Sequence, residues 1–342
     1  MCGIVGYVGD IGSGNRADAP TDGGTADTVG GIIHRGLRNL EYRGYDSAGV
    51  AVVSETNGVT VTKQSGEGDA LSVPEVPGAT HGIGHTRWST HGPPTDANAH
   101  PHTDCTGDIA VVHNGIVENY ETLKAELSDH EFTSDPATEV IPHLIEEALD
   151  DEPGADLLTA VQRVEERLDG SYAVCVVHEG TDQIVVARCG SPLVVGRSTD
   201  ASFVASDVTA FLGYTRDVLY LEDGDIAVVN DDDVSVMHRG EPVERSVETV
   251  TWEADAAEKG GYDHYMRKEI HEQPEALRQT IAGRLDVDAG DADLDVSFPP
   301  GFLADLEEIQ IVACGTSNYA GRYAAQRVEE LAGVVRGAAR DD

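Results

Sequence analysis

The sequence predicts a layered α+β fold, and three observations lead to that prediction. Residues 3–8, close to the start of the chain, form an apolar run of strand character. Between residues 120 and 168, apolar side chains recur at helical spacing, and from 171 to about 243 one short apolar strand follows another. Strands on both sides of paired helices are typical of helices that pack on the faces of sheets.

The remaining elements follow in order along the chain. Residues 10–27 are rich in Gly, Asp, Ser and Pro and predict a loop, and 29–40 carry the apolar stripe of a helix. Strands are expected at 50–54, 59–64 and 109–112, the last one leading into a turn at His113-Asn114-Gly115. Further helices are predicted at 120–127, 140–149 and 157–168, and further strands at 173–177, 184–187, 193–195, 203–205, 218–221 and 226–229.

The composition changes near residue 243. Residues 244–261 predict a polar linker, 262–284 a helix interrupted by Pro274, and 286–300 an acidic loop. A buried strand at 309–313 then leads through Cys314-Gly315-Thr316-Ser317 into a helix at 318–331. This order is typical of a phosphate-binding helix N-terminus and equally of an ordinary α/β turn, so both interpretations stay open. Because a lone parallel strand has no sheet to join, we expect poor packing beyond residue 250.

The composition describes a globular protein with a strongly acidic surface. Its 342 residues include 62 acidic and 23 basic side chains, for a net charge of −39, and 40% are hydrophobic. Since such charge repels itself unless salt screens it, we expect a salt-adapted, halophilic protein. The sequence lacks a basic stripe, a membrane-length apolar run and a signal-peptide core, which argues for a cytoplasmic protein without nucleic-acid or membrane partners. Five scattered cysteines fit reduced thiols.

Cys2 is the first candidate catalytic residue. A thiol at a chain end is easily oxidised and is a poor structural choice. If Met1 is removed, however, Cys2 carries both a thiol and an α-amine, whose ordinary pKa of about 8 lets it accept the thiol proton at neutral pH. The residues alone fit an incidental cysteine on a buried strand equally well.

Three other groups invite a chemical interpretation. Asn114 and Gly115 place a side-chain amide beside a backbone N–H, which is the composition of an oxyanion hole, although Asn-Gly is also the commonest hairpin turn. Arg87 beside Trp88 suits a carboxylate contact or a surface ion pair. Five histidines lie between residues 85 and 113. Their spacing completes no metal-ligand set, so packing or substrate contact is favoured, and no metal or cofactor is predicted.

Several long motifs resemble those of glucosamine-6-phosphate synthases, also called glutamine–fructose-6-phosphate aminotransferases. In chain order they are MCGIVG at the start, EYRGYDSAG at 41–49, HTRWSTHG at 85–92, NAHPH at 98–102 and VHNG at 112–115. The resemblance covers the glutaminase half and continues through 264–270, 272–274 and 313–317. Related amidotransferases share the cysteine start and the HNG, but the two longest motifs point to the amino-sugar branch.

The resemblance implies an N-terminal-nucleophile fold, an αββα sandwich of two stacked antiparallel sheets between helical layers. It implies a class II glutamine amidotransferase domain at 2–243, a linker at 244–261 and the truncated start of a sugar-isomerase domain at 262–342. Because most of the isomerase half is missing, this chain alone is not expected to make glucosamine 6-phosphate.

The same resemblance assigns roles to single residues. Cys2 attacks the side-chain amide of L-glutamine, giving a thioester and ammonia, with its freed α-amine as the base. Asn114 and the Gly115 N–H form the oxyanion hole. The glutamine pocket comprises Arg87, which binds the carboxylate, and Trp88, Thr90 and His91. A partial site for the phosphate of fructose 6-phosphate comprises Cys314, Gly315, Thr316 and Ser317.

One departure concerns the α-ammonium of glutamine. The family usually has an aspartate where this chain has Ala137. Loss of a charged hydrogen bond costs about 1.5–3 kcal/mol, or roughly ten- to a hundredfold in affinity. Asp135 either substitutes from two residues away or, as the sequence favours, caps the next helix ahead of Pro136.

Three functions therefore stay open. The chain is the glutaminase portion of a truncated synthase, or a non-catalytic remnant or regulatory subunit, or a stand-alone amidotransferase that supplies ammonia to a separate synthase chain. A homodimer and a separate isomerase partner are both compatible with the sequence.

Overall fold

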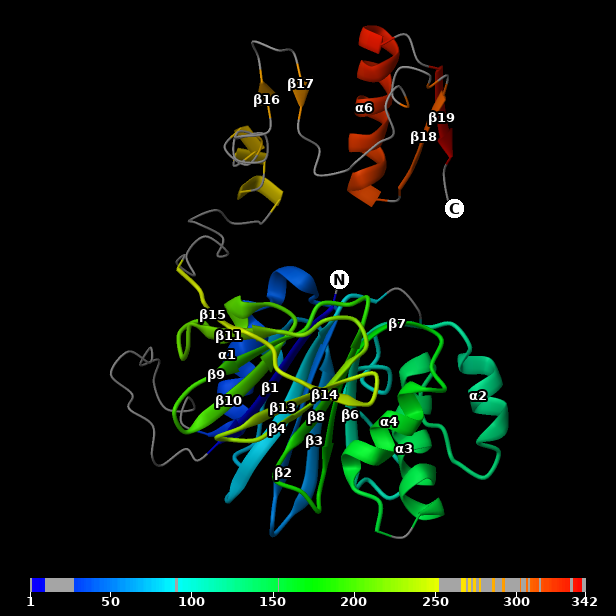
Figure 1. The fold of residues 1–342 in the computed structure, drawn as a ribbon. Helices are drawn as coiled ribbons and strands as arrows, with labels where there is room; N and C mark the ends of the chain where they lie inside the picture. The colour runs from blue at the N-terminus through cyan, green and yellow to red at the C-terminus, as the bar shows by residue number, and fades with distance from the viewer. Residues whose placement is uncertain are drawn as a thin grey trace. The chain divides into compact units, whose positions relative to one another are not determined.

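The computed structural model describes residues 2–9, 28–89, 92–152 and 154–251, together with shorter stretches between 266 and 339 (Figure 1). The chain divides into two compact units, Met1–Tyr265 and Met266–Asp342. The loop predicted at 10–27 lies outside the described residues.

Two antiparallel sheets form the centre of the first unit. The first sheet contains β1 (Gly3–Gly9), β2 (Ser47–Ser54), β3 (Gly58–Ser65), β4 (Ala79–Arg87), β9 (Val194–Arg197), β10 (Ala201–Ala205), β11 (Asp217–Tyr220) and β15 (Val247–Thr249). The second contains β5 (His102–Thr103), β6 (Ile109–Val117), β7 (Gly170–His178), β8 (Ile184–Cys189), β12 (Asp225–Val229), β13 (Val234–His238) and β14 (Glu241–Val243). Their spatial orders are β15-β11-β9-β10-β1-β4-β2-β3 and β14-β13-β12-β8-β7-β6-β5.

Helices cover the outer face of each sheet. The helix α1 (Val29–Asn39) lies on the first sheet, whereas α2 (Tyr120–Glu126), α3 (Val140–Asp151) and α4 (Leu157–Glu165) gather on the second (Figure 1). One apolar cluster fills the space between the sheets, and two others lie under the helical layers. The predicted αββα sandwich is therefore confirmed.

The side chains of β1 alternate between the two layers on either side of the first sheet. Ile4 and Val8 face the second sheet, whereas Val5 and Tyr7 face α1. Being paired with β4 on one edge and β10 on the other, β1 has no free edge over these residues. The chain therefore begins in the interior of its own sheet.

The helix α1 approaches the first sheet at two glycines of β4. A Cβ added at Gly82 would lie 3.0 Å from Ile33 Cδ1, and one added at Gly84 would lie 2.5 Å from Ile33 Cγ2 and 3.1 Å from Leu37 Cδ1. A side chain at either position would push the helix away from the sheet.

The substitution Gly84→Ala tests this close approach. We expect it to lower the free energy of unfolding by about 1–3 kcal/mol, because the new methyl group overpacks the contact with Ile33. Urea unfolding in molar KCl, followed by circular dichroism, measures the change. The matched control is Gly68→Ala, whose Cβ would meet Ala48 Cβ at 3.9 Å. Equal stability of the two variants would contradict the argument.

Two strand predictions require correction. The turn predicted at 113–115 is wrong, because β6 continues to Val117 and pairs with β7 over its whole length, Gly115 standing opposite Tyr172. The strand β4 falls in a stretch for which the sequence predicts no element. A strand is recognised in a sequence by alternating apolar and polar side chains. The glycines and histidines of β4 do not show this alternation.

The predicted linker at 244–261 begins too early. Residues Val247–Thr249 form β15, which pairs with β11 at the edge of the first sheet, and Val250 is buried. Residues 252–261 lie outside the described part of the chain.

The second unit contains two pairs of strands. Short strands β16 (Leu285–Asp286) and β17 (Asp291–Ala292) pair just after the predicted helix, where the sequence predicts an acidic loop at 286–300. The strand β18 (Glu308–Val312), the helix α6 (Gly315–Ala332) and β19 (Val335–Ala339) follow, with β18 and β19 parallel. The expectation that the predicted strand has no partner is therefore wrong. Large apolar side chains of this unit stay exposed all the same, among them Val312, Tyr319, Tyr323 and Leu331.

The helix predicted at 262–284 is described only at 266–268, 270–271, 273–274 and 277, all helical. Among the described residues, no helix is both long enough and apolar enough to cross a membrane. The described cysteines Cys2, Cys105, Cys175 and Cys189 are free thiols.

Candidate active site

Cys2 lies at the start of β1 on the side that faces the second sheet. Because alternate residues of a strand face opposite sides, it shares the side of Ile4. Arg43, which ends the short helix η1 (Glu41–Arg43), donates from Nε to the Cys2 carbonyl at 3.0 Å. The Trp88 N–H donates to Cys2 Sγ at 3.3 Å. Both the backbone and the sulfur of Cys2 are thus held by neighbouring segments.

The Cys2 thiol is not activated by its surroundings alone. Burial raises the pKa of the thiol above its ordinary value, and the Trp88 N–H, Arg87 and Arg43 oppose this only in part. The neutral thiol is therefore the resting form at neutral pH. Nucleophilic attack by Sγ requires a base that takes its proton.

Asn114 reaches Cys2 from β6 of the facing sheet. Its Nδ2 donates to the Cys2 carbonyl at 3.1 Å and to Ser206 Oγ at 2.9 Å, and its Oδ1 lies 2.9 Å from His85 Nε2. Because a carbonyl only accepts, the NH₂ group of Asn114 must face Cys2. Its Oδ1 must then accept from His85, so the neutral imidazole carries its hydrogen on Nε2. These contacts fix the orientation of the amide.

Ser206 and His85 are site residues that the sequence did not reveal. Ser206 Oγ accepts from the Ile4 N–H at 2.9 Å as well as from Asn114, so it joins β1 to the facing sheet. Nothing in its sequence surroundings distinguishes it from other serines that follow a strand. His85 lay in the histidine-rich stretch, but its role depends on β4 and β6 facing one another.

Gly115 follows Asn114 with a backbone conformation that favours glycine. Its φ is +131°, and an added Cβ would lie 1.9 Å from the Ser171 carbonyl oxygen. Only glycine fits here, and Gly115 is exposed whereas the neighbouring Asn114 is buried.

Arg87 and Asp135 flank one point in the structure. Arg87 ends β4, is 5% exposed and donates from Nη1 to the Asn98 carbonyl at 3.1 Å. The Asn98 side chain donates to Asp135 Oδ2 and accepts from the Asp135 N–H, both at 3.0 Å. A Cβ added at Gly92 would lie 3.8 Å from Arg87 Nη2 and 3.5 Å from Asp135 Cβ. A cation and an anion placed in this way suit the two charged ends of an α-amino acid.

Asp135 does not cap a helix, which corrects the interpretation favoured from the sequence. The short helix η3 (Ala137–Glu139) follows Pro136 without a side-chain cap, and α3 begins only at Val140. Ala137 packs against the apolar cluster beneath the helices. The carboxylate of Asp135 therefore stays with Asn98.

Glu139 shapes the loop that precedes η3. Its Oε1 accepts from the N–H and hydroxyl of Thr133 at 2.7 and 2.8 Å, and its Oε2 accepts from those of Ser134 at 2.9 and 2.7 Å. Thr138 Oγ1 and His113 Nδ1 lie 2.9 Å apart and connect this loop to β6. No role was predicted for Thr133, Ser134 or Glu139 from the sequence.

The other predicted site residues are less well defined. Trp88 is 42% exposed and meets the Tyr45 ring edge-on, with centroids 5.2 Å apart. Thr90, His91 and Cys314 lie outside the described residues, as does the side chain of Thr316, and Gly315 is described only as the first residue of α6. Ser317 is exposed in the first turn of α6.

Four of the five histidines between residues 85 and 113 are described, and they pack together around the site. The rings of His85 and His100 stack with centroids 4.1 Å apart, and His102 meets His100 edge-on at 4.7 Å. Burial lowers the pKa of His85 to about 3 and that of His113 to about 4. It also holds the pKa values of His100 and His102 well below the ordinary range. All four are neutral at pH 7.

Buried neutral histidines make stability depend on pH. Burial also lowers the pKa of His81 on β4 to about 4, so the folded state binds fewer protons than the unfolded chain below pH 6.5. Stability is therefore full above that pH and falls as the pH drops toward 4, by about 2 kcal/mol per histidine at pH 5. Urea unfolding at pH 7, 6 and 5 checks this.

The variant His81→Gln isolates one of these groups away from Cys2. Its stability should depend less on pH between pH 7 and pH 5 than that of the parent, which is unfolded in parallel as the reference. An unchanged slope in His81→Gln would contradict the assignment.

Comparisons with known proteins agree with this geometry. A family described as a glutamine amidotransferase domain matches residues 85–213. The glutamine–fructose-6-phosphate aminotransferase (isomerizing) of Halobacterium salinarum is 53% identical, over 96% of this chain and 52% of that protein. The protein of the same name from Thermus thermophilus is 46% identical, over 97% and 52%. The chain thus spans about half the length of the curated relatives it matches.

Two solved structures are similar in fold. The allosteric regulatory enzyme of purine biosynthesis gives a TM-score of 0.55 at 26% identity, covering 69% of this chain and 49% of that one. The glutamine phosphoribosylpyrophosphate amidotransferase from B. subtilis gives 0.56 at 20% identity, covering 98% and 65%. With these neighbours, the predicted N-terminal-nucleophile fold is confirmed.

Proposed function

We propose that the chain is a member of the glutamine amidotransferases and hydrolyses the side-chain amide of L-glutamine through Cys2. One observation carries the proposal above all others: Asn114 of the second sheet and the Arg87–Trp88 end of β4 meet at Cys2 of the first strand. Nucleophile, amide donor and cation come from three separate segments of the chain, so their meeting depends on the whole sandwich.

The α-amine of Cys2 supplies the base in this proposal, once Met1 is removed. It takes the thiol proton, and Sγ attacks the amide carbon to form a tetrahedral intermediate. The Gly115 N–H and Asn114 Nδ2 stabilise its oxyanion, which replaces one of the two acceptors that Nδ2 holds at rest. Collapse breaks the C–N bond, the α-ammonium returns the proton, and ammonia leaves. Water then hydrolyses the thioester to glutamate and restores the thiol.

Arg87 and Asp135 select the substrate in this proposal. The guanidinium of Arg87 binds the α-carboxylate of glutamine, and the carboxylate of Asp135 binds its α-ammonium. The contact with Asn98 supports this role for Asp135, because it directs the carboxylate to the side of Arg87. Trp88, Thr90 and His91 complete the pocket by the motif resemblance.

The use of the ammonia is inferred from the relatives, which are named glutamine–fructose-6-phosphate aminotransferases. We propose that the ammonia serves the conversion of fructose 6-phosphate to glucosamine 6-phosphate in the cytoplasm. On this view, residues 262–342 are the beginning of a sugar-isomerase domain, and Cys314 to Ser317 form part of its phosphate site at the start of α6. The synthase step requires the rest of an isomerase half, in the same chain or in a partner. A catalytically impaired family member is the alternative.

Loss of the nucleophile tests the glutaminase proposal. Ammonia release from glutamine is measured in molar KCl, with protein shown by intact mass to begin at Cys2. We expect turnover by the parent and a decrease in kcat of more than about a thousandfold in Cys2→Ala, because the covalent route is lost. The matched control Cys189→Ser should keep the parental rate. A folded parent without turnover would favour the impaired alternative.

Two substitutions test the ammonium contact. Asp135→Asn should raise the KM for glutamine roughly ten- to a hundredfold with a smaller effect on kcat, since it removes one charged hydrogen bond. Asp129→Asn removes the same charge from an exposed position of the same loop and serves as the control. Ala137→Asp should not lower KM, because residue 137 packs beneath the helices. A marked gain in affinity from Ala137→Asp would transfer the role to position 137.

A further inference from the structure

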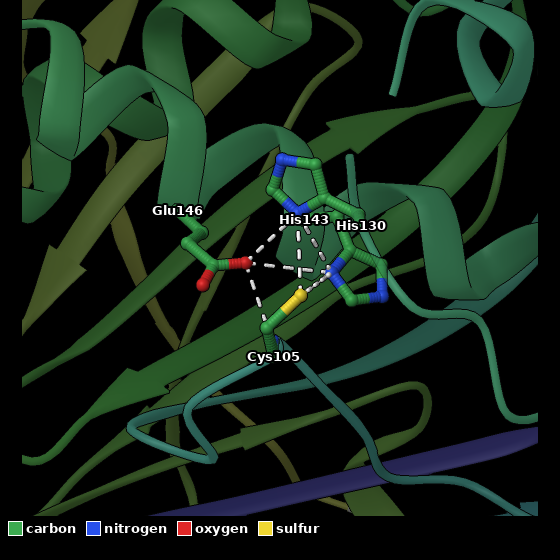
Figure 2. Close-up of side chains that lie close together, drawn as sticks. All are labelled: Cys105, His130, His143 and Glu146. Atoms are coloured by element: carbon green, nitrogen blue, oxygen red, sulfur yellow. Dashed lines mark hydrogen bonds and ion pairs between the residues drawn. The ribbon is translucent and has the colours of Figure 1, made fainter. Parts of the chain in front are cut away.

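A second cluster of reactive side chains lies beside α3, apart from the Cys2 site. Figure 2 shows Cys105, His130, His143 and Glu146 pointing toward one another. Cys105 lies between β5 and β6, His130 between α2 and α3, and the other two lie one turn apart on α3. One potential ligand atom from each residue lies within 4.8 Å of all the others.

The separations are those of a compact tetrahedron. Cys105 Sγ lies 3.4 Å from His130 Nδ1 and 3.5 Å from His143 Nδ1, and the two Nδ1 atoms are 3.3 Å apart. Glu146 Oε2 lies 3.0 and 3.4 Å from the same two nitrogens. Bond lengths typical of tetrahedral zinc separate a sulfur from a nitrogen ligand by about 3.6 Å, and two nitrogens, or a nitrogen and an oxygen, by about 3.4 Å. Five of the six edges are therefore close to those of such a site, and the sixth, from Cys105 Sγ to a carboxylate oxygen of Glu146, is at most 4.8 Å.

Hydrogen bonding alone does not account for this arrangement. Each Nδ1 atom carries at most one hydrogen, yet each faces a sulfur, a carboxylate oxygen and the other Nδ1. Glu146 Oε2 also accepts from the Cys105 N–H at 3.2 Å, which fixes the carboxylate at the cluster. Four electron-pair donors directed at one point are the usual environment of a cation.

We propose that Cys105, His130, His143 and Glu146 bind one Zn²⁺ ion as a tetrahedral structural site. A thiolate and a carboxylate supply two negative charges against the two positive charges of the ion, and mixed sulfur and imidazole ligands suit zinc better than magnesium or calcium. His143 is 1% exposed, and His130 and Glu146 are 16% and 14% exposed. Cys105 is exposed, which gives the ion a path of entry.

The ion would connect three segments that lie beside the second sheet. They are the connection between β5 and β6, the loop after α2, and α3 itself. That loop continues into Thr133 and Ser134, which Glu139 holds. The loop between α2 and η3 is therefore held at His130 by the zinc site and at Thr133 and Ser134 by Glu139. No metal was predicted from the sequence, where only the histidines between residues 85 and 113 drew attention. The four proposed ligands spread over 42 positions, and their only local signal is the His143–Glu146 spacing of one helical turn.

Metal binding by the full chain tests the proposal directly. Protein stripped with a chelator is titrated with Zn²⁺ against a chromophoric competitor, and with Co²⁺ as a spectroscopic probe. We expect one zinc ion per chain. The cobalt form should show the intense visible bands of tetrahedral geometry and a sulfur-to-cobalt charge-transfer band.

The variants Cys105→Ser and His130→Gln should weaken zinc binding at least about a hundredfold, since even outer partners of metal ligands cost ten- to a hundredfold. Cys189→Ser is the matched control and should bind like the parent. Circular dichroism verifies that each variant is folded, and having two independent ligand variants keeps the test valid if one fails to fold. The proposal is overturned if the parent binds no stoichiometric zinc, if its cobalt form is octahedral, or if both ligand variants keep parental affinity.

Discussion

The pairing of β1 between β4 and β10 is the constraint on which the rest of the site depends. This register sets Ile4 opposite His85 and Gly3 opposite Thr86, so Cys2 and Arg87 come together at the end of the ladder. On the other edge, Val5 stands opposite Ala205, which brings Ser206 to the backbone of Ile4. A shift of one residue would turn Cys2 toward α1 and separate it from Asn114. The apolar clusters on the two faces of β1 prevent such a shift.

Much of this arrangement was predictable from local patterns. The amphipathic stripe at 29–40 and the apolar runs after residue 170 depend on side-chain period, which the folded chain preserves. Cys2, Asn114 and Arg87 stood out as candidates by their chemistry, but the residues alone left ordinary structural roles open, and only the motif resemblance assigned them roles in a glutaminase site. The layers followed from the order of the elements, since helices with one apolar stripe must cover a sheet face.

The misassigned residues share a physical cause: a nonlocal partner outweighs a local preference. Asn114-Gly115 prefers a hairpin turn, but β7 offers a nine-residue partner strand, and the chain continues straight. Asp135 before a proline prefers a helix cap, but the amide of Asn98 satisfies both its carboxylate and its N–H. Ser206 carried no local signal, and the Cys105 cluster carried only the spacing of His143 and Glu146, because both groupings arise from segments that meet only in the folded chain.

The hydrogen bonds that position Cys2 bind its carbonyl oxygen and do not depend on the state of its α-nitrogen. Arg43 and Asn114 bind that carbonyl oxygen, and neither contact involves the α-nitrogen. A fusion partner joined to the N-terminus would therefore leave both contacts intact while converting the α-nitrogen into an amide without basicity. Under the proposed mechanism, such a fusion protein would fold with its site assembled but without the base that activates the thiol, and would resemble a zymogen. Production of the active form accordingly calls for purification tags at the other end of the chain, or for a protease that cuts directly before Cys2.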